Sequence, residues 1–371
     1  MAVLPKSGCA VARLPGGRQN ARIATIFTGN CGSMSIKTCW TVTDGRAGML
    51  NQAQGLAEEL ARTEPGGNMI VSHRIIDVRA PWRWLPPALW HAPLQKLTGN
   101  SDPLRPPWPD VVIGCGRLTV PLVMAIARQA RGAGTGTGNC FTVQLQDPRV
   151  DPGHYDLVVP PRHDHLDGPN VFQTTGAVHR VTAARLETGA DSFRAALDHL
   201  PHPRIAVLIG GSNKYYRLTP AVMRQLADRL KGLTTMHGAG LMVTTSRRTG
   251  VENEKALRAA LADTATVFWD GQGDNPYFAY LGLADEIVVT CDSVSMCSEA
   301  ASTGKPVHVV QLEGGSAKFN EFHASMRHQG HTRIFDGNLP DWQPVRLDDT
   351  ALVAAEVRRR LETRTTDKTS A

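Results

Sequence analysis

The segment 291–306 has the spacing of polar residues best suited to holding a ligand. Four polar side chains recur there at intervals of three and four residues: Ser295, Ser298, Glu299 and Ser302. Apolar runs precede and follow the segment, which predicts a helix between two buried parallel strands. Residues at this spacing share one helix face. A polar face with one carboxylate, starting at a helix N-terminus, suits a ligand with phosphate and sugar hydroxyls. The alternative is an ordinary solvated face.

A glycine turn follows the apolar run 204–209. It contains Gly210, Gly211, Ser212 and Asn213. Glycines let a backbone approach a ligand closely, and exposed N–H groups can cradle a phosphate. Such turns also occur at strand ends for steric reasons alone, so both interpretations stay open.

Two adjacent arginines, Arg247 and Arg248, follow another predicted strand, 240–245. Ligands bind at the carboxyl ends of the strands in an open parallel sheet. A guanidinium there could neutralise a diphosphate through two parallel hydrogen bonds. A solvated basic turn is the alternative.

The first half of the chain holds the candidates for proton transfer. Asp44 follows the predicted strand 36–43 and is a candidate general base, or else the cap of a tight turn. The loop and helix after it could contact phosphate or an acceptor through four residues: Gly45, Arg46, Gly48 and Gln52. Segments 146–149 and 161–164 each follow a further strand. In the second of these, His163 or Asp164 is another candidate base, or a hydrogen-bonded surface residue.

Strand-like runs alternate with amphipathic helices along the chain, which predicts an α/β fold with parallel sheets. We expect two Rossmann-like domains facing a cleft, at residues 36–200 and 201–330, with a hinge at 201–203. A helix at about 191–200 closes the first domain. Residues 331–371 form a C-terminal segment with a final helix at 352–362.

The charge of this 371-residue chain is unevenly placed. The net charge is +6, yet five of the 40 Lys and Arg residues precede the first acidic residue, Asp44, and the rest is almost neutral. No basic run alternates with aromatics, which argues against a nucleic-acid partner. Residues 1–35 fit a disordered extension, a targeting peptide or, as we favour, a misassigned start with Met34 as the true first residue.

The seven cysteines include no CxxC pair and form no zinc or disulfide pattern. Buried thiols in a reducing cytoplasm fit this usage. We find no motif for a metal or another cofactor and no apolar run long enough to span a membrane.

Four tryptophans gather in one segment among basic and proline residues: Trp82, Trp84, Trp90 and Trp108. Aromatic and basic side chains together suit a membrane interface or a lipid-linked acceptor. A packed loop with a local aromatic cluster is the alternative.

Four motifs together resemble the bacterial relatives of the plant elongated-mitochondria fission factor: 43–52, 209–212, 245–249 and 292–306. The resemblance covers roughly residue 36 to the C-terminus. It implies a protein partner, since the plant member is implicated in recruiting a dynamin-related protein to mitochondria.

The same motifs resemble GT-B glycosyltransferases. That resemblance implies an acceptor-side first domain, a second domain that binds a nucleotide-diphosphate sugar, and catalysis without a bound metal. The glycine turn would contact the donor diphosphate, and Glu299 would contact the donor ribose. An adaptor without catalysis and an epimerase-like enzyme are the alternatives. We expect a cytoplasmic protein, or one peripheral at the inner face of the membrane.

Overall fold

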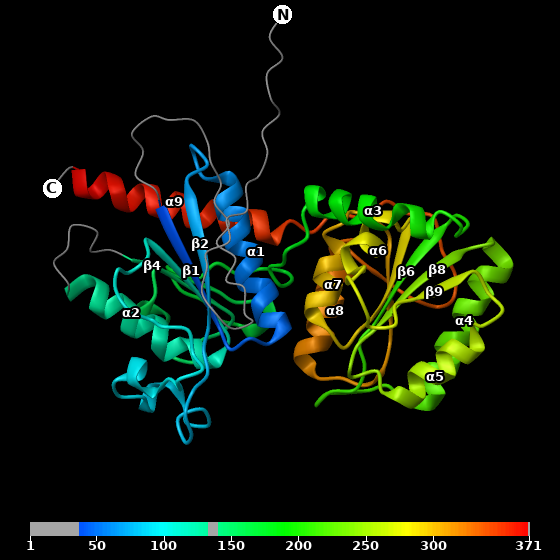
Figure 1. Ribbon diagram of the computed structural model, residues 1–371, viewed down its shortest axis with the longest axis horizontal. Coiled ribbons are helices and arrows are strands. Elements are labelled where there is room, and N and C mark those ends of the chain that lie inside the picture. The colour runs from blue at the N-terminus through cyan, green and yellow to red at the C-terminus, as the bar shows by residue number, and fades with distance from the viewer. Residues whose placement is uncertain (1–36, 133–139, 370–371) are drawn as a thin grey trace, which may run out of the picture. The chain divides into compact units, whose positions relative to one another are not determined.

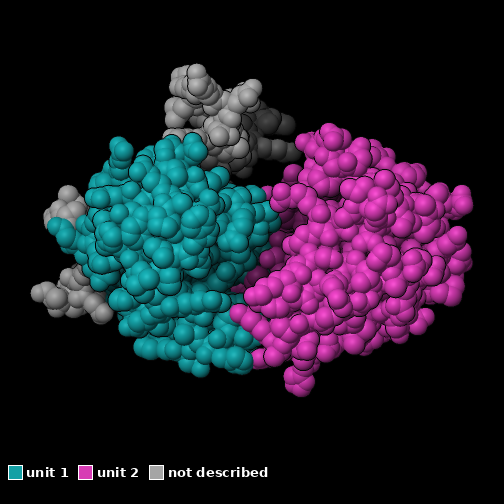
Figure 2. Space-filling view, turned by 90° about the horizontal axis from the view of Figure 1, so that it is seen from below, with its two compact units in different colours: residues 1–174, 178–180, 350–371 teal, residues 175–177, 181–349 magenta. Residues whose placement is uncertain are grey.

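The structure, a computed structural model, describes residues 37–132 and 140–369 (Figure 1). The expectation for residues 1–35 lies outside this range. The chain forms two compact units, coloured separately in Figure 2. Unit 1 holds the described residues up to Thr174, together with Val178–Arg180 and the chain from Thr350 onward. Unit 2 holds Thr175–Ala177 and Val181–Asp349.

Unit 1 is built on a parallel sheet with the order β2-β1-β3-β4-β5. Its strands are β1 (Lys37–Thr43), β2 (Met69–Ile75), β3 (Val111–Cys115), β4 (Phe141–Leu145) and β5 (Leu157–Val159). Its helices are α1 (Ala47–Thr63), α2 (Val120–Gly132) and α9 (Asp349–Thr369), with short 3-10 turns η1 (Pro87–Leu89), η2 (Pro93–Lys96), η3 (Arg117–Thr119), η4 (Pro152–His154) and η5 (Arg162–Asp164). The strand order reverses between β1 and β3, the switch point of a doubly wound sheet.

Both faces of the unit 1 sheet are covered. Cys39 and Ile113 face a core shared with α1 and with Val353 and Val357 of α9. Their strand neighbours, Trp40 among them, face the core shared with α2. Strand residues alternate between faces, and the central strand β3 is buried on both, so all of its residues are apolar or glycine.

Unit 2 contains a parallel sheet with the order β13-β11-β10-β6-β8-β9. Its strands are β6 (Arg204–Ile209), β8 (Gly240–Thr245), β9 (Thr266–Phe268), β10 (Glu286–Thr290), β11 (Val307–Val310) and β13 (Arg333–Ile334), and β7 (Tyr216–Arg217) pairs separately with β12 (Glu313–Gly314). Counted along the unit, this is the 3-2-1-4-5-6 order of the Rossmann fold, and its switch point lies between β6 and β10.

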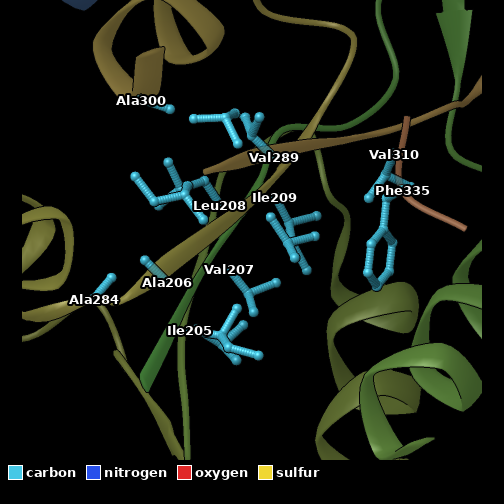
Figure 3. Packing of buried hydrophobic residues seen from close by; sticks show 14 of the residues in the cluster. Ile205, Ala206, Val207, Leu208, Ile209, Ala284, Val289, Ala300, Val310 and Phe335 are labelled. Carbon is cyan, nitrogen blue, oxygen red and sulfur yellow. The ribbon is translucent and has the colours of Figure 1, made fainter. Parts of the chain in front are cut away.

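Helices flank the unit 2 sheet, with α4 and α5 on one side and α7 and α8 on the other (Figure 1). The helices are α3 (Ala183–Leu197), α4 (Pro220–His237), α5 (Val251–Ala260), α6 (Tyr277–Leu283), α7 (Val294–Ala301) and α8 (Ala317–His328). The side chains of the fully buried β6 pack with neighbours such as Val289, Ala300 and Val310 (Figure 3).

Helices α3, α6 and α9 differ from the sequence-based predictions, and the short strands β7, β12 and β13 were not predicted. Helix α3 begins at Ala183 rather than near 191, because the Thr182 hydroxyl accepts the Arg185 N–H and caps it. It belongs to unit 2, where Ala190 and Leu197 join the core, although the prediction placed it in the first domain. The short helix α6 was not predicted. Helix α9 is not part of a separate C-terminal segment, since its apolar residues complete the core of unit 1.

Candidate functional site

Two of the predicted donor-side segments, the turns after β6 and β8, come together at the switch point of unit 2. Gly210 follows β6, Arg248 follows β8 and Asp292 follows β10, all at the carboxyl ends of neighbouring strands. Such crevices are where open α/β sheets bind ligands. Asp292, which was not among the predicted site residues, is the centre of this group.

The Asp292 carboxylate is completely buried. It accepts hydrogen bonds from the Arg248 Nη2 at 2.6 Å, from the Gly211 N–H at 3.1 Å and from the Thr290 hydroxyl at 2.7 Å. A buried carboxylate is stable only when its oxygens are satisfied in this way. Asp292 therefore ties together the turns that follow β6, β8 and β10.

The glycine turn has a steric reason for its composition. A Cβ at Gly210 would lie 2.2 Å from Asp292 Oδ1, and one at Gly211 would lie 2.1 Å from the Arg248 carbonyl oxygen. Gly211 also has φ +151°. A side chain at either position would push the turn away from its neighbours.

The N–H groups of this turn are used inside the protein. Those of residues 210 to 213 donate, in order, to the Thr290 hydroxyl, the Asp292 carboxylate, the Arg248 carbonyl and the Tyr216 carbonyl, at 2.8 to 3.1 Å. The expectation that they cradle phosphate is therefore corrected: in this structure they hold the turn to its neighbours. The side chains of Ser212 and Asn213 also bond within the unit.

The two arginines differ in their surroundings. Arg248 has a 45% exposed side chain whose guanidinium is fixed by Asp292. Arg247 is exposed and pairs with no other residue in the described parts of the chain. Because Asp292 offsets the charge of Arg248, Arg247 supplies the excess positive charge at this edge.

The polar face of α7 is mostly buried. Ser298 is 0%, Ser302 2% and Glu299 5% exposed, while Ser295 is half-buried. The alternative of a solvated helix face is therefore wrong. Ser298 is also not free to line a ligand site, because its hydroxyl accepts the Ala177 N–H at 2.9 Å and donates to the Val294 carbonyl at 2.8 Å.

Glu299 has a partner that the sequence did not reveal. The Tyr277 hydroxyl donates to its Oε2 at 2.5 Å, and burial, together with the neighbouring carboxylate, raises the pKa of Tyr277 well above its ordinary value. Tyr277 is the first residue of α6, the helix missed from the sequence. The only local signal was Asn275-Pro276, a pair typical of a turn that starts a helix.

In unit 1, the predicted base Asp44 is held in an ion pair. Its carboxylate accepts the Arg46 Nε at 2.8 Å, and this hydrogen bond raises the pKa of Arg46. Gly45 forms the turn between them with φ +79°, and Gly48 lies in the first turn of α1. Asp44 could act as a base only after release from Arg46.

Gln52 lies on α1, is buried, and contacts a residue that follows β4. Its Oε1 accepts the Gln146 Nε2 at 3.2 Å, and Gln146 follows β4 with φ +71°. A left-handed glutamine is strained, and strain of this kind concentrates at functional sites. The sequence marked 146–149 as a strand end but did not single out Gln146.

The other candidate bases are little exposed. His163 and Asp164 lie on η5 with side chains 7% and 6% exposed, and His163 Nε2 lies 3.8 Å from Asp164 Oδ1. The structure therefore places both inside unit 1 rather than at its surface.

Comparison with known proteins gives this chain a family. The model of the family described as Mitochondrial fission ELM1 matches residues 47–361, well over half of the chain. The chain belongs to the mitochondrial fission ELM1 family. The Arabidopsis thaliana mitochondrial fission protein ELM1 is 34% identical over 283 residues, which cover 69% of this chain and 65% of that protein. Protein RP120 of Rickettsia prowazekii is 25% identical over 339 residues, covering 81% of this chain and 91% of its own.

The fold of this ELM1-family chain also occurs in solved structures. A Listeria monocytogenes protein assigned as a UDP-N-acetylglucosamine 2-epimerase aligns with a TM-score of 0.52 at 11% identity, covering 88% of each chain. A likeness at this identity shows the fold alone. The predicted α/β, GT-B-like fold class is confirmed.

The tryptophan segment of this family member is partly packed. Trp90 is buried against Trp82, and Trp108 packs edge-on against Trp40. Trp84 is 71% exposed. The Arg117 guanidinium fixes the segment by donating to the carbonyls of Leu85 and Arg83.

The described residues lack two features. No helix there is long and apolar enough to cross a membrane. No three His, Cys, Asp or Glu side chains gather in that part of the chain as they would around a metal ion.

Acid should destabilise unit 2 of this ELM1-family chain through His323. Its Nε2 donates to the Cys291 carbonyl at 2.8 Å, and burial lowers its pKa, with Arg327 lowering it further and Asp292 opposing. Below about pH 6.5 the unfolded chain binds the proton more readily than the folded one, so stability falls as pH falls toward the folded pKa. In urea unfolding between pH 7.5 and 5, we expect His323→Gln to show a shallower loss than wild type.

The control for this experiment lies on the same helix. His328 is exposed, so His328→Gln should keep the wild-type slope. Equal slopes for His323→Gln and wild type would show that His323 does not govern the acid sensitivity.

Proposed function

We propose that this chain binds a nucleotide-diphosphate sugar at the carboxyl edge of the unit 2 sheet and transfers the sugar to an acceptor. The observation that carries the proposal is the half-exposed Arg248 guanidinium, oriented by the buried Asp292 at the β6–β10 switch point. A guanidinium fixed at that edge suits a diphosphate. The name of the Listeria protein includes a UDP-sugar, which supports this ligand class.

In this proposal side chains contact the phosphate, because the N–H groups of the glycine turn are bonded within the protein. Arg248 keeps N–H donors beyond the one that bonds Asp292, and Arg247 adds the uncompensated charge. Gly210 and Gly211 contribute indirectly, because without side chains they leave room for Asp292 and for the backbone of Arg248. Ser212 and Asn213 keep the turn in shape through their own hydrogen bonds.

Glu299 is proposed to accept hydrogen bonds from the donor ribose. Tyr277 occupies part of Oε2 and holds the carboxylate in one orientation. A carboxylate has two oxygens with about four lone pairs, so one carboxylate can accept from Tyr277 and from a ligand hydroxyl together. Ser295, half-buried on the same helix, would line the site beside it.

Calorimetry with a panel of UDP- and GDP-sugars tests the donor site. We expect Glu299→Gln to weaken binding about tenfold or more, because the amide replaces a charge-assisted acceptor with a neutral one. Tyr277→Phe is the matched control: it removes the same hydrogen bond but keeps the carboxylate, so binding should change much less.

Two results would overturn the donor-site proposal. One is the absence of binding by the wild type to every sugar nucleotide of the panel. The other is unchanged binding in Glu299→Ala. If Glu299 only ties α6 to α7, Glu299→Gln and Tyr277→Phe should lower the stability by similar amounts and leave binding alone.

The acceptor side is proposed to be the carboxyl edge of the unit 1 sheet, with Asp44 as base once Arg46 moves to the ligand. Gly45, Gly48 and Gln52 would shape that edge. Transfer would proceed without a metal. The acceptor would be membrane-associated or lipid-linked, met by the segment 82–108, on a protein in the cytoplasm or at the inner face of the membrane.

A non-catalytic adaptor is the second candidate. The Asp44–Arg46 ion pair and the internally bonded glycine turn favour it, since both withdraw groups from catalysis. Membership of a mitochondrial fission family also favours a protein partner. Affinity capture of one stoichiometric partner, together with no sugar-nucleotide binding, would support this function.

An epimerase-like reaction on the same donor would differ in its products. Release of nucleoside diphosphate only in the presence of an acceptor would support transfer. Conversion of the sugar without any acceptor would support epimerisation.

A further inference from the structure

A basic cavity of about 620 Å³ lies in unit 1 and is lined in part by the tryptophan segment, including Trp90. One wall is a single face of α2, with Met124, Arg128 and Arg131 at positions i, i+4 and i+7. Pro87 and Ala88 of η1 form a second wall. The loop 149–154 after β4 forms the third. Three segments distant in sequence therefore build the cavity.

The charge of the lining is predominantly positive. Arg128, Arg131 and Arg149 meet one carboxylate, that of Asp151, which already accepts the Gly153 N–H at 2.9 Å. His154 also lines the cavity. None of the three guanidinium groups forms an ion pair with a residue in the described parts of the chain.

Two of the arginine side chains are oriented by hydrogen bonds to backbone carbonyls of their own helix, α2. Arg128 Nε donates to the Met124 carbonyl and Arg131 Nε to the Ala127 carbonyl, both at 3.3 Å. Their Nη groups have no acceptor among the described residues. Arginines near a helix C-terminus also complement its dipole, but Arg149 comes from a separate loop, and the dipole does not explain its presence.

We propose that this cavity binds a phosphate-bearing anion through Arg128, Arg131 and Arg149. Guanidinium forks match phosphate oxygens and form paired hydrogen bonds with them. The volume is that of a small-molecule site and exceeds a lone phosphate, so a diphosphate or a substituted phosphate fits better. The proposal does not involve unit 2 and stands apart from the donor site.

The phosphate could belong to a soluble ligand or to a lipid headgroup. Leu89, at the end of η1, is 61% exposed, and Trp84 before it is 71% exposed. Apolar side chains beside an anion site would enter the interface of an anionic membrane. The experiment must therefore separate the two sources.

The test pairs two charge-matched variants. Arg128→Gln/Arg131→Gln removes two guanidinium groups from the cavity, and Arg79→Gln/Arg224→Gln removes two from exposed positions outside the cavity and outside the segment 82–108. Calorimetry measures binding of inorganic pyrophosphate. Cosedimentation measures binding to vesicles of phosphatidylcholine alone or mixed in equal parts with phosphatidylglycerol. Arg128→Lys/Arg131→Lys, which keeps the charge, should retain part of the binding.

We expect the cavity variant to lose about tenfold or more in affinity while the control stays near wild type. Loss for pyrophosphate identifies a soluble source; loss only for the mixed vesicles identifies a headgroup. No binding to either probe, or an equal loss in both variants, would overturn the proposal.

Discussion

Replacing Asp292 with alanine should lower the free energy of unfolding by about 3 to 4 kcal/mol. The carboxylate is completely buried and holds the turns after β6, β8 and β10. Its loss leaves the Gly211 N–H and the Thr290 hydroxyl without their acceptor. The Arg248 pair itself should contribute only about 1 kcal/mol, because that side chain is 45% exposed and screened by water. Urea unfolding followed by circular dichroism measures the change.

Asp274→Ala is the matched control, because Asp274 is exposed and the change should stay within about 0.5 kcal/mol. A double-mutant cycle with Arg248→Gln isolates the pair from the rest of the effect. If Asp292→Ala proved no more destabilising than Asp274→Ala, the carboxylate would not be what joins the three turns.

Replacing Gly55 with alanine should cost about 3 kcal/mol or more, as overpacking against backbone does. A Cβ at this position of α1 would lie 2.1 Å from the His179 carbonyl oxygen. That segment cannot easily move away. The His179 N–H donates to the Thr350 hydroxyl at 3.0 Å, and Arg180 forms an ion pair with Glu58 of α1 at 2.6 Å. Thermal unfolding measures the effect.

Gly232→Ala is the control, and we expect it to raise rather than lower the free energy of unfolding. This glycine also lies inside a helix, α4, but a Cβ there would meet only the Met236 side chain, at 3.5 Å. Alanine should then stabilise by up to about 1 kcal/mol through helix propensity. A stabilising Gly55→Ala would mean that residues 178–180 are not packed tightly against α1.

Much of the site was visible in the sequence because its signals are local. Gly210, Arg248 and Glu299 each follow a short apolar run or occupy the helix after one. In a parallel sheet this places them at or near the carboxyl edge without knowledge of the rest of the fold. The same reasoning placed Asp44 after β1 and the segment 146–149 after β4. The switch point itself could not be read, because strand order depends on pairing between distant segments.

The hydrogen-bond partners of the site residues could not be predicted for the same reason, because they come from distant segments. Tyr277 lies on a seven-residue helix with little periodic pattern, yet it holds Glu299. Ser298 has the spacing of a ligand-facing residue, but its hydroxyl already accepts a hydrogen bond from the Ala177 N–H. Asp292 precedes Ser293, the cap of α7, and its completely buried carboxylate joins three turns.

The sequence by itself determined the α/β class, the crossover units and the strand ends that carry polar chemistry, since each depends on hydrophobic periodicity and turn residues within a short span. The tertiary structure alone decided that α9 completes the core of unit 1, that α3 belongs to unit 2, and that the glycine turn donates its N–H groups to its own neighbours. These outcomes depend on which distant surfaces bury each other and which distant acceptors satisfy each donor, and a linear pattern does not contain that information.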